Sequence, residues 1–181
     1  MTKAHTLLGV VAASTIAGAA AAEATIEFEN FIASGAQFFQ IDGTLDALTG
    51  ELTGATGDFV MNADGENFTW CDDFCVLIAN SDLTALHVQI GGFSDFGATH
   101  RATWTDGASG DAGTQGGGAA VGLEGPIDVT GWTLWIGNGY GSGGNGDWSG
   151  SVDLEGSIEL PAPGALALLG LSGLVARRRR G

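Results

Sequence analysis

The sequence predicts an all-β body, an antiparallel β-sandwich, carried between two targeting segments. Apolar and polar residues alternate in several segments, and 32 of the 181 residues are glycine. Alternation with a period of two places one face of a strand on a core, whereas glycine destabilises long helices. The hydrophobic fraction of 44% argues against a disordered chain. We therefore expect one domain at residues 23–160, with residues 1–22 and 161–181 outside it.

Residues 1–22 have the layout of a secretory signal peptide. A short polar start with Lys3 precedes an uncharged run of small and apolar residues that ends at Ala22. The small residues fit the cleavage rule of signal peptidase, which would cut after Ala22 or after Ala24. An uncleaved membrane anchor is the weaker alternative, because the run is short and rich in alanine. The chain is therefore expected to be exported.

The clearest strand signal lies near the end of the body. Trp148, Val152, Leu154 and Ile158 share one parity, and the acidic and serine residues between them share the other. That pattern predicts a strand or hairpin with one buried and one solvated face. Glycine-rich turns separate the other segments at the spacing of a sandwich or barrel. Further strands are expected at residues 26–28, 38–41, 44–52, 59–61, 68–70, 76–79, 83–90, 101–104 and 132–136.

Two glycine-rich stretches, residues 106–118 and 137–146, are expected to be long surface loops. The second contains a G-x-G-x-x-G match at residues 139–144. No helix follows it, so a dinucleotide site is not expected. Residues 143–147 come one residue short of a calcium-binding nonapeptide and occur once, whereas such sites need stacked repeats.

Cys71 and Cys75 are the only cysteines, and a pair in an exported protein favours a disulfide. Four residues of extended chain would separate the Cα atoms by about 13 Å, whereas a disulfide needs roughly 4.4–6.8 Å. The bond therefore requires a turn at Asp72 and Asp73. A metal site is the weaker alternative because two thiolates lack companion ligands, and the spacing does not fit a redox motif.

The body is strongly acidic, with one base, Arg101, against all 21 acidic residues of the chain. No cluster of bases is present to neutralise phosphates, which excludes nucleic acid as a partner. Scattered carboxylates serve solubility, and no cofactor is expected. Calcium is the one ion that this composition leaves open, because it prefers oxygen ligands.

No catalytic constellation stands out in the body, so we predict that it is not an enzyme. His87 lies among apolar strand residues and His100 beside Arg101, and neither is expected to act as a base. Most of the five tryptophans are expected in the core. Trp135, however, has the opposite parity to Trp132, which makes it a candidate exposed aromatic that could stack on sugar.

Residues 161–181 form a second candidate targeting segment. An apolar stretch at 165–176 is followed by arginines, which is a stop-transfer layout. The apolar part covers about 17 residues, the lower limit for a span, so we expect a short transmembrane sorting helix. A proline motif and a basic cluster border it: Pro161, Ala162 and Pro163, then Arg177, Arg178, Arg179 and Arg180.

This tail resembles the PEP-CTERM sorting signal of Gram-negative and related bacteria, which is also known as the C-terminal domain of ice-binding proteins. The resemblance implies that an exosortase processes the tail in the membrane and that the protein is released or attached at the cell surface. Proteins of this family are associated with bacteria that make extracellular polysaccharide, which is therefore an implied partner. The chain departs from the motif at Ala162, where the family has Glu.

The second half of the body resembles bacterial jelly-roll modules related to the proprotein-convertase P domain. The similar segments are residues 88–93, 131–137 and 146–148, in which a tryptophan strand leads into a glycine-rich loop and a second tryptophan strand. This resemblance implies a jelly-roll-like sandwich.

These observations predict a non-enzymatic protein of the bacterial envelope or extracellular matrix, either secreted or held at the cell surface by its C-terminal helix. Polysaccharide is its expected partner. A small carbohydrate-active enzyme is one alternative, which would need two carboxylates about 5 to 10 Å apart in a cleft. An ice-binding protein is the other, which would need a flat and regular threonine array.

Overall fold

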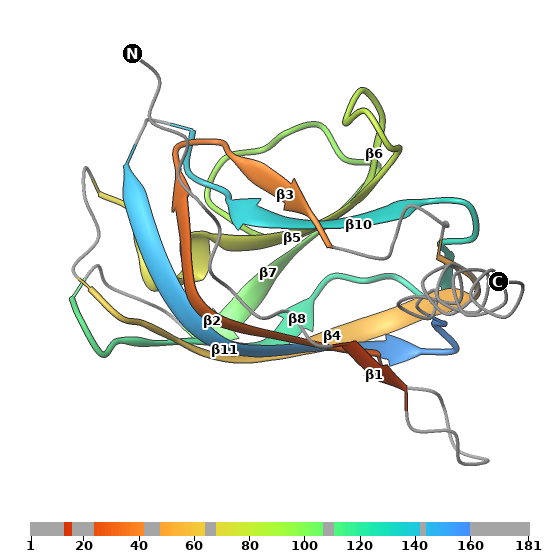
Figure 1. Cartoon of the computed structure of the whole chain (residues 1–181). Coiled ribbons are helices and arrows are strands. Elements are labelled where there is room, and N and C mark those ends of the chain that lie inside the picture. The colour runs from red at the N-terminus through yellow and green to blue at the C-terminus, as the bar shows by residue number, and fades with distance from the viewer. Residues whose placement is uncertain are drawn as a thin grey trace, which may run out of the picture.

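The computed structural model describes residues 13–15, 24–41, 48–63, 68–106, 111–141 and 144–159, and it confirms the all-β prediction (Figure 1). Besides strands, the described elements include one 3₁₀ turn, η1, which leads directly into β5. The elements are β1 (Ala13–Thr15), β2 (Ala24–Ser34), β3 (Phe38–Gln40), β4 (Glu51–Met61), η1 (Cys71–Asp73), β5 (Phe74–Ala79), β6 (Leu86–Gly91), β7 (His100–Asp106), β8 (Gln115–Val121), β9 (Ile127–Asp128), β10 (Thr133–Asn138) and β11 (Asn145–Gly156).

The strands form one mixed sheet that nearly closes into a barrel. Their order is β1-β2-β11-β4-β8-β7-β6-β5-β10-β3, and β9 pairs with β4 off this path. Figure 1 shows β2, β11, β4 and β8 on one side and β3, β10, β5 and β6 on the other, with β7 between them. Among the described strands only β6 and β7 pair in parallel, with Val88 opposite His100. The expected antiparallel arrangement is corrected at this point, because the parallel pair joins the two sides into one sheet.

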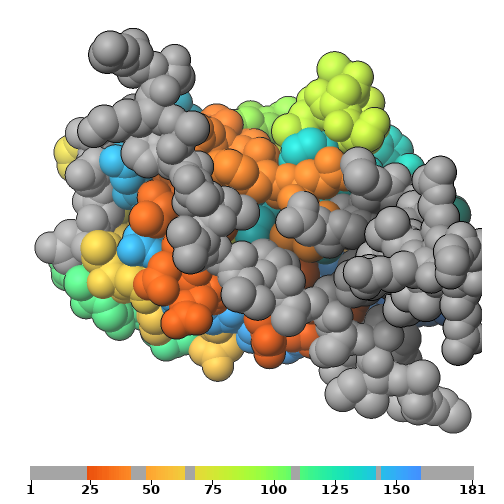
Figure 2. Space-filling view, viewed as in Figure 1, coloured from red at the N-terminus to blue at the C-terminus, as the bar shows by residue number. Residues whose placement is uncertain are grey.

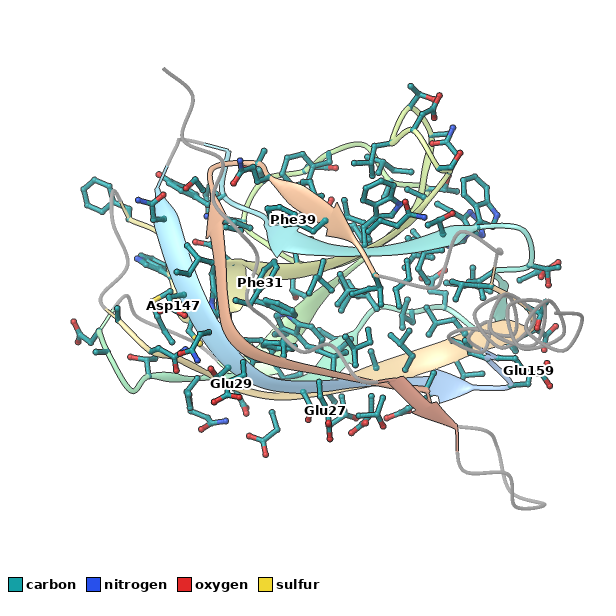
Figure 3. All side chains as sticks on the ribbon, viewed as in Figure 1. Glu27, Glu29, Phe31, Phe39, Asp147 and Glu159 are labelled. Atoms are coloured by element: carbon teal, nitrogen blue, oxygen red, sulfur yellow. The ribbon has the colours of Figure 1, made fainter. Side chains whose placement is uncertain are left out.

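The long strands β2 and β11 carry the alternation that the sequence predicts, whereas the third long strand, β4, runs without interruption through residues 53–58, which the sequence analysis left between two shorter strands. The three strands pair in antiparallel fashion over most of their length and lie side by side at the surface (Figure 2). Val152 and Leu154 of β11 are fully buried. Figure 3 shows Glu27 and Glu29 on the outer side of β2 and Phe31 on its inner side. The predicted one-sided strand near residue 150 is therefore confirmed.

Aromatic rings fill much of the core between the two sides of the sheet. Phe74 of β5 stacks on Phe28 of β2 with ring centroids 4.4 Å apart, and it meets Phe59 at 5.0 Å. Trp148 and Trp104 are also buried, as expected of core tryptophans. The indole Nε1 of Trp104 donates a hydrogen bond to the main-chain oxygen of Phe74 at 3.0 Å, so the ring nitrogen is satisfied inside the core.

Three predicted boundaries are wrong. Residues 68–70 form a loop, in which Phe68 has a φ of 66°, rather than a strand. Leu83, with a φ of 57°, lies in a turn, so β6 begins at Leu86. Residues 115–118, expected in a loop, open β8 instead. At Gly117, φ is +99° and a Cβ atom would lie 2.4 Å from the main-chain oxygen of Gly57, so glycine is required there by close strand contact.

The predicted targeting segments lie almost entirely outside the described residues. Within 1–22, only Ala13–Thr15 is described, as β1 pairing with β2. The sorting motif and the expected transmembrane helix at 161–181 fall beyond the last described residue, Glu159. Within the described part of the chain, no helix has the length and apolar character needed to cross a membrane.

Candidate functional site

A pocket of about 230 Å³ opens at the surface where three loops meet. Its lining is four aromatic side chains and one carboxylate: Phe68, Trp70, Asp73, Phe93 and Tyr140. Phe68 and Phe93 are 79% and 72% exposed, and Trp70 is 50% exposed. Large aromatic side chains gathered in the open around a cavity are typical of a binding site, because folding alone would bury them.

Asp73 forms the base of this aromatic pocket and is only 4% exposed. Its Oδ2 accepts a hydrogen bond from the main-chain N–H of Trp70 at 2.7 Å. Its Oδ1 accepts one from the N–H of Phe93 at 3.1 Å. One carboxylate thus holds the loop of Trp70 and the loop of Phe93, a residue 20 positions after Asp73 in the sequence. The turn of η1 makes this geometry by folding Asp73 back under Trp70.

Main-chain hydrogen bonds clamp the same three loops together. The N–H groups of Gly92 and Gly139 donate to the oxygens of Asp72 and Asp73, at 3.0 Å and 2.6 Å. Gly92 has a φ of +76°, and a Cβ atom there would lie 2.8 Å from the Cα of Gly139. The two glycines therefore let the loops approach closely. As a result, the residue after each glycine places its ring next to the ring from the other loop.

Those next residues are Phe93 and Tyr140, whose ring centroids are 6.0 Å apart and inclined at 58°. Arg101 supports the arrangement from β7, since its Nη2 donates to the main-chain oxygens of Gly92 and Phe93 at 3.2 Å and 3.0 Å. Hydrogen bonds therefore hold the main chain of the loops from which Trp70, Phe93 and Tyr140 project.

Burial raises the pKa of the Asp73 carboxyl, and the hydrogen bonds from Trp70 and Phe93 oppose that rise. Its neighbour Asp72 points to β8 and accepts a hydrogen bond from the N–H of Gly117 at 3.1 Å. Burial raises the pKa of Asp72 to about 6, and the nearby charges of Asp106 and Asp73 add to the effect. Desolvation therefore disfavours the charged form of both carboxyl groups.

The predicted disulfide is not formed in this structure, where Cys71 and Cys75 are free, buried thiols. The expected turn at Asp72 and Asp73 does exist, as η1. Cys71, however, packs in the core, whereas Cys75 points away from it, toward Gly139. Burial raises the pKa of Cys71 to about 12 and also raises that of Cys75, so neither thiol is activated.

Trp135 lies on the face of β10 opposite to Leu134 and Ile136, as its parity predicts, but it is mostly buried and is not part of the aromatic pocket. Its Nε1 is buried and has no hydrogen-bond partner among the described residues. The Nε2 of Gln40, which lies opposite Trp135 on β3, is also buried and has no hydrogen-bond partner among the described residues.

The exposed aromatic side chains of the described residues are instead Phe68, Trp70 and Phe93. An aromatic residue directly after or between glycines, as in residues 91–93 and 139–141, is the sequence signal that marks two of these loops.

The two histidines that the structure describes, His87 and His100, are not part of the lining of the aromatic pocket. His87 stacks on Trp132 with centroids 4.7 Å apart, and His100 meets His87 edge-on at 5.3 Å. The Nε2 of His87 lies 3.0 Å from the main-chain oxygen of Asp128. In the described ranges, no group of three or more His, Cys, Asp or Glu side chains is placed to hold a metal ion.

Comparison with known protein families, curated proteins and solved structures gives no match for this chain.

Proposed function

We propose that the chain is a non-enzymatic protein of the bacterial envelope or extracellular matrix that binds polysaccharide through the aromatic pocket. The observation that carries this proposal is the gathering of four aromatic side chains around one cavity, three of them at least half exposed. A sugar ring has an apolar face of C–H groups that packs on an aromatic ring, and hydroxyls that form hydrogen bonds to polar groups such as a carboxylate.

A binding role suits this pocket better than hydrolysis. Among the described residues its lining contains a single carboxylate, Asp73, whereas hydrolysis of a glycosidic bond uses a pair. The oxygens of Asp73 already hold two loops by hydrogen bonds, which fixes the floor of the pocket. Preformed aromatic positions lower the entropy that binding must overcome. A jelly-roll-like module of this kind would present the pocket on a rigid body.

Export and sorting complete the proposal and rest on the two ends of the sequence. Signal peptidase would remove residues 1–22, and an exosortase-type enzyme would process residues 161–181 in the membrane. The basic cluster would hold the tail on the cytoplasmic side, each arginine adding about 1 kcal/mol of attraction to anionic lipid. Replacing Arg177, Arg178, Arg179 and Arg180 with neutral residues should change membrane retention and the size of the released product. Unchanged retention and size would remove exosortase-type sorting from the proposal.

Binding to polysaccharide is tested with purified exported protein and a panel of soluble oligosaccharides, using tryptophan fluorescence as the readout because Trp70 lines the pocket. Trp70→Ala and Phe93→Ala should each weaken binding about tenfold or more, the equivalent of 1.4 kcal/mol. Val121→Ala is the matched control, since Val121 is apolar and 52% exposed but lies on β8, outside the pocket. Calorimetry replaces fluorescence for Trp70→Ala. Wild-type affinity in both pocket variants, or no binding to any saccharide, would contradict the proposal.

A further inference from the structure

We infer that the aromatic pocket takes a sugar unit that carries a protonated amine, with the ammonium group facing Asp73 and the sugar ring packed against the aromatic side chains. This inference rests on the proposed polysaccharide binding and adds the chemical class of the sugar. The inference follows from the buried carboxyl group of Asp73, from the aromatic side chains that line the pocket and from the excess of acidic residues in the body.

Asp73 is a buried acid that has no cationic partner within the described part of the chain. Among the described residues its carboxylate has hydrogen bonds from two main-chain N–H groups and no ion pair. Buried carboxylates in proteins are normally paired with a positive charge, because desolvation without compensation is costly. Each oxygen of Asp73 retains capacity for another hydrogen bond. A cation supplied by the ligand would complete the pairing.

Arg101 is the only lysine or arginine among the described residues. Its Nη2 is directed at the main-chain oxygens of Gly92 and Phe93, behind the loop, and not at Asp73. The guanidinium group therefore supports the wall without neutralising the floor. Asp72, the preceding residue of η1, is another acid and supplies no positive charge to Asp73 either.

The walls of the pocket are aromatic rings. The faces of tryptophan, tyrosine and phenylalanine rings attract cations as well as apolar C–H groups. Trp70, Phe93 and Tyr140 can therefore stabilise both halves of an amino sugar, its ring and its ammonium group. A neutral sugar would leave the charge of Asp73 uncompensated, and a uronic acid would place a second negative charge beside it.

The field of the whole body points the same way. Residues 23–160 contain one base and all 21 acids of the chain, so a cationic polymer is attracted and an anionic one repelled. Glutamates on the outer side of β2 contribute to this field (Figure 3). Electrostatic complementarity thus favours a polysaccharide with free amino groups over one with carboxylates or sulfates.

The experiment compares oligomers of equal length by calorimetry at pH 6: glucosamine, N-acetylglucosamine, glucose and a uronic acid. We expect the glucosamine oligomer to bind about tenfold or more tightly than the other three, as a charge-assisted hydrogen bond predicts. Asp73→Asn should remove this preference, and it should also weaken binding of all four oligomers, because the Asn side chain keeps only one of the two acceptors that hold the loops of Trp70 and Phe93. Asp95→Asn is the matched control, because Asp95 is an exposed acid in the loop of Phe93 that lies outside the pocket lining. It should keep the preference.

Salt provides a second test that does not depend on the folding of the Asp73→Asn variant. In the wild-type protein, raising the salt concentration should weaken binding of the glucosamine oligomer more than that of the neutral ones. Equal affinity for charged and neutral oligomers would overturn the amino-sugar inference while leaving polysaccharide binding intact. Tighter binding of the uronic acid would overturn it as well. No binding of any oligomer would instead reject the proposed function itself.

Discussion

Trp148 and Cys71 are joined by a hydrogen bond through the core: the indole Nε1 of Trp148 donates to the main-chain oxygen of Cys71 at 2.9 Å. Trp148 belongs to β11, the last long strand, and is fully buried. Cys71 opens η1, the turn that carries Asp73 to the floor of the aromatic pocket. The position of the pocket floor is therefore set by the barrel core, 77 residues further along the chain.

Trp148→Phe should lower both stability and binding. The substitution removes one of the two donors to the oxygen of Cys71 and leaves only the N–H of Phe74, at a cost of about 0.5–1.5 kcal/mol, and the smaller ring adds a cavity. Urea unfolding measures the loss, and the affinity for saccharide should fall because η1 loses its anchor. Trp104→Phe is the control, since it removes a similar hydrogen bond, to Phe74 directly after η1, and leaves the bond from Trp148 to Cys71 in place. Equal losses of affinity in both variants would show that η1 is not specifically anchored by Trp148.

Gly139→Ala should open the aromatic pocket without changing any of its rings. The new Cβ atom would lie 2.4 Å from the Cα of Gly92, so the loops of Phe93 and Tyr140 must separate. Forcing extra volume into such a contact costs about 1–3 kcal/mol. Gly141→Ala, two residues away, meets only the Ser94 side chain, with Oγ at 3.2 Å, and serves as the control. Calorimetry should show weaker saccharide binding in Gly139→Ala and unchanged binding in Gly141→Ala. Wild-type affinity in Gly139→Ala would show that binding does not need the close contact between the loops of Gly92 and Gly139.

Asp72 makes the protein less stable as the pH rises through the window between its ordinary pKa of 3.8 and its folded-state pKa of about 6. The folded state binds this proton more tightly than the unfolded state, so deprotonation opposes folding. Asp72→Asn should be more stable than the wild type at pH 7.5, by at most about 1 kcal/mol because solvent screens a half-exposed group. The difference should vanish near pH 3.5, since both side chains are then neutral.

Asp82→Asn tests the sign of that effect. Asp82 is exposed, and hydrogen bonds from Thr84 hold the pKa of its carboxyl below the usual value. Its charged form favours folding, so removing it should slightly destabilise the protein at neutral pH, opposite to Asp72→Asn. Thermal unfolding of the three proteins at both pH values provides the comparison. A destabilised Asp72→Asn at pH 7.5 would show that the carboxylate of Asp72 is stabilising after all.

The alternation of apolar and polar residues was enough to predict the all-β class of the fold. It also predicted the buried face of β11, because Trp148, Val152 and Leu154 lie an even number of residues apart. The parallel pairing of β6 and β7 was not predictable, since it depends on which strands meet in space. Gly117 was misread as a loop residue because composition does not reveal that β8 lies against the backbone of Gly57. The aromatic pocket was missed for the same reason, since its loops, near residues 70, 93 and 140, come together only through long-range hydrogen bonds.

The sequence and the structure differ most sharply over Cys71 and Cys75, and labelling can decide between them. The structure holds both as buried free thiols, with the pKa of each raised by burial. Since the thiolate is the reactive form, the native protein should react very slowly with a thiol reagent at pH 8. In denaturant without reductant, two thiols per chain should then react at once.

A disulfide gives a different pattern, because its sulfurs remain unreactive in denaturant until a reductant is added. Cys75→Ser provides the control in which one thiol per chain is expected after unfolding, whatever the state of the pair in the wild type. The two thiols pack on different sides of the chain, Cys71 in the core and Cys75 toward Gly139, so forming the bond would require η1 to rearrange. Because η1 carries Asp73, an oxidised protein should also lose its affinity for saccharide. Oxidised protein with full affinity would show that the pocket floor tolerates the bond and that the thiol arrangement described here is not required for binding.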